Sequence, residues 1–190
     1  MDKIFAALVL ALTFGSPLAS ADEYSETIGV FKNAGESADF FKTSYGYAVF
    51  PTIGKGGLGV GAAHGDGKVY EKGKYIGDTS MTQVSVGFQA GGEAFSQIIF
   101  FQNKGALDQF TSGNFEFSAD VGAVAIKSGV SGSAGTSGAT GTASSGGGQA
   151  AATGGSYHKG MAVFTVTKGG AMVQATIGGQ KFKYKAAGGT

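Results

Sequence analysis

The sequence predicts an α+β fold that is mainly β, in which one or two N-terminal helices pack on an antiparallel sheet or a small barrel-like sheet. Three observations favour this class. Apolar residues recur at intervals of three and four over residues 22–44, as in an amphipathic helix. From residue 45 onward, short runs alternate apolar and polar residues between glycines, as half-buried strands do. A segment of Gly, Ser, Ala and Thr interrupts these runs, and the alternation resumes after it.

The first 21 residues have the pattern of a secretory signal peptide. Lys3 supplies the positive charge, residues 4–14 form the apolar stretch, and Ala19-Ser20-Ala21 is the expected cleavage site. The apolar stretch is too short to span a bilayer. The chain has no Cys, so we expect neither a lipid anchor nor disulfide bonds. The pattern predicts export to the periplasm or the exterior, with residues 22–190 as a single domain.

Residues 22–44 are predicted to be helical, as one helix or as two short helices that meet near Gly35. Their apolar residues form one face, and the polar residues opposite are a mixture of Glu, Asp and Lys. A helix that lies on an anionic membrane usually has a basic polar face. We therefore expect this face to pack on the sheet. The apolar face consists of Ile28, Phe31, Ala34, Ala38 and Phe41.

The stretch from residue 45 to 65 begins as a buried strand and continues into closely spaced glycines. Pro51 lacks a backbone donor and is expected to end that strand or to place it at a sheet edge. A strand without side chains on one face lets another backbone or a flat ring lie against it. We predict such a bare face, on which either another strand packs closely or a ligand binds. The glycines concerned are Gly56, Gly57, Gly59 and Gly61.

The next elements are predicted from turn and alternation signals. Asp66-Gly67 suits a two-residue hairpin. Strands are expected at residues 81–88 and 94–101, separated by a bend at Gly91-Gly92, and the second strand is apolar enough to be buried on both faces. Asn103 is the expected N-cap of a short helix over residues 104–110. A single long strand is expected over residues 115–125.

Residues 128–156 contain no charged or aromatic residue. The pattern of ordered structure is expected to resume at residue 157. Such a composition cannot bury a core, so we expect a disordered Gly/Ser/Ala loop inserted within the domain. Three further strands are expected at residues 161–166, 171–177 and 181–185.

Charge is distributed unevenly along the chain. Residues 22–120 contain 12 acidic residues and 7 Lys, whereas residues 121–190 contain 6 Lys and no acidic residue. We therefore expect the second half to attract anionic partners, with no local acid to neutralise its lysines. The chain has no Arg, which disfavours nucleic-acid binding. The candidate lipid-binding residues are Lys159, Lys168, Lys181, Lys183 and Lys185; the alternative is that the last three protect an edge strand.

Residues suited to catalysis are scarce. The chain has two His and no Cys, and its carboxylates are scattered without an evident acid–base pair. Residues 54–59 fit G-x-G-x-x-G, but the expected strand, rather than a helix, follows them. We therefore predict no enzymatic activity, catalytic residue, metal or cofactor.

Several motifs, taken in order, resemble those of the SYLF domain family: GYAVFP at residues 46–51, GFQAGGE at 87–93, NKGAL at 103–107 and YHKGM at 157–161. The resemblance covers about residues 44–179. It implies a mainly β domain that binds lipids, with phosphoinositides as ligands of eukaryotic members, some of which also bind actin. The chain differs from the family pattern in lacking a Trp after the first hairpin and in carrying the long Gly/Ser/Ala segment.

Two functions follow from these observations. The first is a non-enzymatic module that binds a lipid or an anionic membrane surface. The second is a structural or interaction protein of the cell envelope or extracellular matrix, with an envelope protein as partner.

Overall fold

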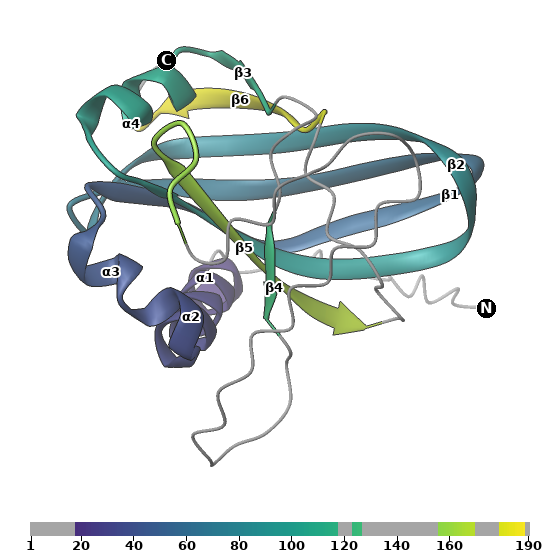
Figure 1. Ribbon diagram of the computed structural model, residues 1–190, viewed down its shortest axis with the longest axis horizontal. Coiled ribbons are helices and arrows are strands. Elements are labelled where there is room, and N and C mark those ends of the chain that lie inside the picture. Colours follow the sequence, from purple (N-terminus) through teal and green to yellow (C-terminus); the bar gives the residue numbers. More distant parts are fainter. Residues whose placement is uncertain (1–17, 118–122, 127–155, 170–178, 189–190) are drawn as a thin grey trace, which may run out of the picture.

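The computed structural model describes residues 18–117, 123–126, 156–169 and 179–188, and it confirms a mainly β fold with few helices (Figure 1). Six strands form one sheet, in which β3, β6, β2, β5 and β4 are neighbours in that order and β1 also pairs with β2. The elements are α1 Leu18–Asn33, α2 Gly35–Ala38, α3 Phe40–Thr43, β1 Gly46–Glu71, β2 Lys74–Phe101, α4 Lys104–Phe110, β3 Asn114–Glu116, β4 Val124–Ile126, β5 Met161–Gly169 and β6 Lys181–Ala186.

The two long strands β1 and β2 form an antiparallel hairpin that extends from the pair Gly46–Phe101 to the pair Glu71–Lys74. Its turn is Lys72-Gly73, where φ is 49° and 79°. The turn expected at Asp66-Gly67 is therefore wrong, because both residues lie inside β1. Gly67 serves a close contact instead, since a Cβ there would lie 2.6 Å from the ring of Phe50.

Strand β1 bends so that its end lies beside its beginning. The amide of Lys72 donates a hydrogen bond of 2.9 Å to the carbonyl oxygen of Tyr45, and a Cβ on Gly65 would lie 2.8 Å from the carbonyl oxygen of Thr52. Pro51 does not end the strand, but the alternative of a sheet edge is confirmed, because β1 pairs with β2 alone among the described strands. The register of β1 shifts between Phe50 and Ile53, and this irregularity accommodates the missing donor. The described strands form an open curved sheet rather than a small closed barrel-like one.

Strand β2 is the common neighbour of β1, β5 and β6. Residues 77–82 pair with β6 and residues 94–101 pair with β5, both antiparallel. The two strands expected at 81–88 and 94–101 are thus parts of β2. The single strand expected over 115–125 is also wrong, because β3 pairs with β6 whereas β4 pairs, in parallel, with β5.

The strands expected at 161–166 and 181–185 are confirmed as β5 and β6. The strand expected at 171–177 lies outside the described residues. So does the predicted loop over 128–156, apart from the exposed Ser156.

Two apolar clusters lie on opposite faces of the sheet. The inner cluster combines β1, β2, β5 and β6 with α4, and the outer cluster lies between the sheet and α1–α3, the helices drawn in purple and dark blue in Figure 1. Ile99 and Phe101 belong to the inner cluster, whereas Ile98 and Phe100 belong to the outer one. The prediction that residues 94–101 are buried on both faces is confirmed for residues 95–101.

The N-terminal helices differ from the prediction in two ways, since there are three of them rather than one or two and the first begins before residue 22. Residues 22–44 are helical in three pieces, and Phe31 is fully buried in the outer cluster with Ile28 and Phe41 packed against it. Helix α1 begins at Leu18, within the predicted signal peptide. The predicted α4 and its cap are confirmed, since the side chain of Asn103 accepts a hydrogen bond from the amide of Ala106.

Candidate functional site

The glycines singled out in the sequence lie midway along the hairpin, where β1 turns back on itself. Gly57 has φ +152°, and a Cβ there would touch the carbonyl oxygen of Val60 and lie 2.7 Å from Gly61 Cα. Gly61 is buried. At Gly56 nothing lies within 4 Å of an added Cβ, and the surroundings of Gly59 lie outside the described part of the chain. The close approach at Gly57 and Gly61 is therefore within β1 itself.

Two of the five predicted lysines lie apart from the others. Lys168 of β5 donates hydrogen bonds to Glu23 Oε1 at 3.1 Å and to Thr52 Oγ1 at 2.8 Å, and so links α1 to the sheet. The hydrogen bond from Thr52 and then that from Lys168 lower the pKa of Glu23 below its usual value. Lys168 thus has a local acidic partner, contrary to expectation. Lys159 is exposed in the turn before β5, where its φ is 49°.

The alternation expected along β6 is confirmed. Lys181, Lys183 and Lys185 are exposed, Phe182 is buried in the inner cluster, and Tyr184 is half-buried. The three ammonium groups therefore extend from the outer face of the sheet.

These lysines also have acidic neighbours that the sequence order did not indicate. Lys181 Nζ lies 3.8 Å from Glu116 Oε2 of β3, and Asp78 of β2 is opposite Lys185 in the ladder. Among the described residues, no acidic oxygen lies within 4 Å of Lys183 Nζ. Because β3 pairs with residues 181–183, the protection of an edge strand does not explain Lys181 or Lys183.

The register of the ladders places β6 beside the exposed parts of β1 and β2. Directly opposite residues in an antiparallel pair have side chains on the same face. Thr82 is opposite His64 on one side and opposite Lys181 on the other, so all three face outward. This surface, which we call the outer patch, consists of Val60, Ala62, His64 and Asp66 of β1, Ser80, Thr82 and Val84 of β2, and Lys181, Lys183 and Lys185 of β6.

One end of the outer patch is apolar and exposed. Val84 is 71% exposed and Val60 is 58% exposed, and Ala62 pairs with Val84 across the ladder. The sequence does not indicate that these valines are exposed, because alternation alone does not say which face of a strand is covered. The other end of the patch stops at Lys68, whose Nζ lies 4.6 Å from the centre of the Tyr24 ring of α1.

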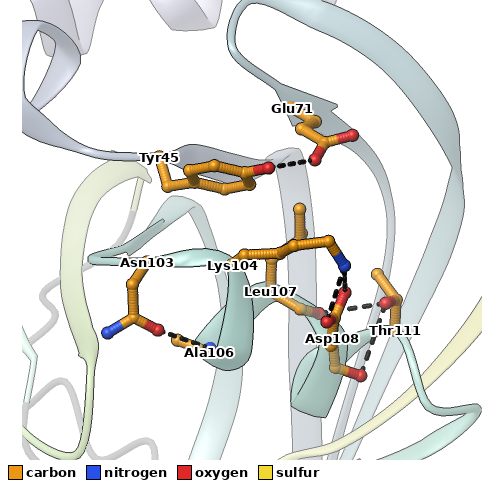
Figure 2. Close-up of polar contacts among 8 residues, drawn as sticks. All are labelled: Tyr45, Glu71, Asn103, Lys104, Ala106, Leu107, Asp108 and Thr111. Carbon is orange, nitrogen blue, oxygen red and sulfur yellow. Dashed lines mark hydrogen bonds and ion pairs between the residues drawn. The ribbon is translucent and has the colours of Figure 1, made fainter.

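A second polar group lies where the two ends of β1 meet, and Figure 2 shows its hydrogen bonds. The hydroxyl of Tyr45 donates to Glu71 Oε1 at 2.6 Å, and this bond raises the pKa of the phenol. On α4, Lys104 Nζ contacts both carboxylate oxygens of Asp108 at 2.8 and 2.7 Å. Each of these two pairs meets its hydrogen-bonding requirement internally, and the pair Tyr45–Glu71 joins the two ends of β1.

Several tyrosines are buried far enough for their acidity to change. Burial raises the pKa of Tyr24 and of Tyr47 to about 12, with smaller effects from Asp66 on the first and from Tyr70 on the second. The rings of Tyr47 and Tyr70 stack with their centres 5.0 Å apart. These phenols stay protonated at neutral pH and pack α1 and α3 against the sheet.

Within the described ranges, no three His, Cys, Asp or Glu residues lie close enough together to hold a metal ion. In the same part of the chain, every helix is too short or too polar to cross a membrane.

Comparison with known proteins adds two findings. The Ysc84 family, described as "Las17-binding protein actin regulator", matches residues 82–186, which is more than half of the 190 residues. The chain is also similar to "Beta cell expansion factor A" of Aeromonas veronii, with 27% identity over 159 residues. This alignment covers 82% of the chain and 51% of the relative, so the chain spans about half the length of the curated protein that it matches. The family match covers most of β2, α4 and β3–β6, and hence the lysines of the outer patch.

Proposed function

Because the chain belongs to the Ysc84 family, the SYLF family that its motifs indicated, we propose that it is an exported, non-enzymatic module that binds the surface of lipid membranes. The outer patch is the proposed binding surface. Export to the periplasm or the exterior is part of this proposal and is supported by the signal-peptide pattern of residues 1–21.

One observation carries the proposal. Val60 and Val84 are exposed at one end of the outer patch, whose other members, apart from Ala62, are polar or charged. Lys181 and Lys183 belong to the same patch and lie on β6, the strand next to β2. Apolar side chains bordered by lysines fit the boundary between acyl chains and negatively charged headgroups. Charge complementarity at the lysines and apolar complementarity at the valines therefore both point to an anionic bilayer.

The magnitudes predict weak and reversible binding. Full burial of a valine side chain contributes about 1.5–3 kcal/mol, and a lysine near an anionic surface contributes about 1 kcal/mol. Lys181 contributes less than this, because Glu116 lies 3.8 Å away. Two valines and two or three lysines stabilise a peripheral contact of a few kcal/mol before the cost of orientation is subtracted.

A second copy of the chain fits the apolar end of the outer patch less well than a bilayer does. A stable protein interface covers about 800 Å² on each partner. Two valines and one alanine supply only a small part of such an area, and the rest of the outer patch is polar or charged. A bilayer does not require a large complementary surface.

We also propose that the chain has no enzymatic activity, because several described carboxylates are already hydrogen-bonded to neighbouring side chains. The carboxylate of Glu71 accepts from Tyr45, that of Asp108 accepts from Lys104, and that of Glu23 accepts from Thr52 and Lys168. Each of these acids is engaged by a neighbouring side chain in a structural contact.

A protein-binding role is the second candidate, and it is favoured by the family description, which names Las17 binding and actin regulation. In this case, the chain would act as an interaction protein of the cell envelope or extracellular matrix. Lack of binding to any vesicle would favour this candidate.

The test is co-sedimentation of the mature protein with phosphatidylcholine vesicles that contain or lack phosphatidylglycerol. We expect binding to the anionic vesicles, and we expect the double variant Val60→Ser/Val84→Ser to lose most of it. Val30→Ser is the matched control, because Val30 is a 44% exposed valine on α1, outside the outer patch. Equal binding by wild type and the double variant would contradict the proposed surface. A change of oligomeric state in the double variant would indicate a second copy as the occupant.

A further inference from the structure

Resting on the proposed function, we infer that the outer patch recognises the bilayer as an extended surface and does not select a single multiply phosphorylated headgroup. The ligand class is thus an anionic bilayer with accessible acyl chains, whichever headgroup provides the negative charge. This distinction depends on how the lysines are arranged and on what lies between them.

The three lysines of the outer patch form a line. Lys181, Lys183 and Lys185 occupy alternate positions of one strand, so successive side chains start about 6.6–6.8 Å apart. Side chains on one face of a strand stand roughly parallel to one another and do not converge on a point. A headgroup with several phosphates is usually held by clustered donors, and most often by Arg. The chain contains no Arg.

Acidic residues also lie next to this line of lysines. Glu116 is within 3.8 Å of Lys181, and Asp78 is opposite Lys185. In the row between them, Lys183, Ser80 and Asp66 follow one another across the three strands. A compact polyanion at Lys181 or Lys185 would meet a carboxylate as well as an ammonium group. A diffuse surface charge is attracted by the exposed lysines together.

The apolar end favours the same ligand class. Val60 and Val84 are the outer-patch residues that gain most from leaving water, and a headgroup alone offers them no apolar surroundings. The acyl chains just below the headgroups do. The valines are therefore expected to affect binding to every anionic vesicle, independently of the identity of the headgroup.

The experiment compares two kinds of anionic vesicle at matched surface charge. Phosphatidylcholine vesicles receive either phosphatidylglycerol or phosphatidylinositol bisphosphate until their zeta potentials agree, and pure phosphatidylcholine is the neutral reference. The proteins are wild type, Val60→Ser/Val84→Ser, Lys181→Gln/Lys183→Gln/Lys185→Gln, and the charge-matched control Lys32→Gln/Lys42→Gln/Lys104→Gln. The control lysines are exposed on α1, α3 and α4, away from the outer patch.

Wild type is expected to bind the two anionic vesicles with affinities within about threefold of each other, which is less than 1 kcal/mol. The valine variant should lose about tenfold or more on both, a loss of 1.4 kcal/mol or greater. The triple lysine variant should lose less than the valine variant, by a similar factor on both vesicles, and the control triple variant should retain wild-type binding.

A preference of more than about tenfold for the bisphosphate at matched charge, abolished in the triple lysine variant, would overturn the inference and leave the proposed function intact. Failure of wild type to bind any vesicle would overturn the proposed function and the inference with it. All substituted residues are exposed or partly exposed, and unchanged circular dichroism and Tm would show that the variants fold.

Discussion

At Gly57 the backbone of the hairpin leaves little freedom of substitution. Its φ of +152° and the contact of an added Cβ with Val60 both disfavour any larger residue. We expect Gly57→Ala to lower the free energy of unfolding by about 1–3 kcal/mol, as sparsely populated backbone conformations do. Chemical denaturation measures this change.

The matched control is Gly56→Ala, one residue earlier in the same strand. Nothing lies within 4 Å of a Cβ at Gly56. Its effect should stay within about 0.5 kcal/mol, as at surface positions without a special contact. Equal effects of the two substitutions would show that the bend of β1 does not depend on Gly57.

Glu23 makes the attachment of α1 sensitive to acid. The pKa of its carboxyl is lowered, first by the hydrogen bond from Thr52 and then by the one from Lys168. A lowered folded-state pKa contributes stability above the unfolded value and loses it as the pH falls through the folded value. We expect stability to decrease as the pH falls below 4.5, the usual value.

The effect should be small, because the Glu23 side chain is 45% exposed and solvent screens its ion pair. The variant Glu23→Gln provides the comparison, since it lacks the titrating group. If wild type and Glu23→Gln lose stability in parallel over the acidic range, the contact with Thr52 and Lys168 does not stabilise α1.

Some residue-level features were predictable because they depend on neighbours in sequence. The position of Asn103 before an apolar helical pattern predicts an N-cap, and the alternation of Lys and aromatic residues predicts the two faces of β6. Both predictions are confirmed. The partners of Lys168 and Lys181 could not be predicted. Glu23 and Glu116 lie far from these lysines in sequence, and only the packing of α1 and the pairing of β3 with β6 bring them close.

Among the elements, β2 and the start of β6 are joined by a buried pair of amides. Gln97 Nε2 donates to Gln180 Oε1 at 2.9 Å, and Gln180 Nε2 donates back to Gln97 Oε1 at 3.1 Å, with both residues fully buried. Replacing one partner leaves the other amide without its hydrogen bonds. We expect Gln97→Leu alone to cost about 1–3 kcal/mol in the free energy of unfolding.

The double variant Gln97→Leu/Gln180→Leu removes both polar groups, so its cost should be less than the sum of the two single variants. A double-mutant cycle by urea denaturation measures the difference. Additive losses would mean that the two amides do not stabilise each other.

The turn of the hairpin shows why element boundaries were less predictable than element types. Asp66-Gly67 and Lys72-Gly73 both suit a tight turn, and only the second has positive φ at both residues. Gly67 is required for another reason, the close approach of Phe50 when β1 bends. That approach is a tertiary contact, which has no local sign in the sequence.

For the whole molecule, the mainly β class followed from composition and alternation, whereas the arrangement of the strands did not. Alternation identifies the two faces of a strand but not its neighbours. The sequence therefore could not reveal that β5 and β6 both pair with β2, or that α1–α3 cover only part of the outer face. The exposure of Val60 and Val84 follows from this incomplete coverage and therefore could not be predicted from the sequence.

The central claim is that the apolar end of the outer patch enters the membrane surface. The chain has no Trp, so a single introduced Trp reports on its own surroundings. Val84→Trp places the probe on the outer patch, and Gln109→Trp places it at an exposed position of α4 as the control. We predict that phosphatidylglycerol vesicles shift the emission of Trp at position 84 to shorter wavelength, and that brominated lipids quench it, with neither effect at position 109. Co-sedimentation without a shift at position 84, or with a larger shift at position 109, would contradict the account.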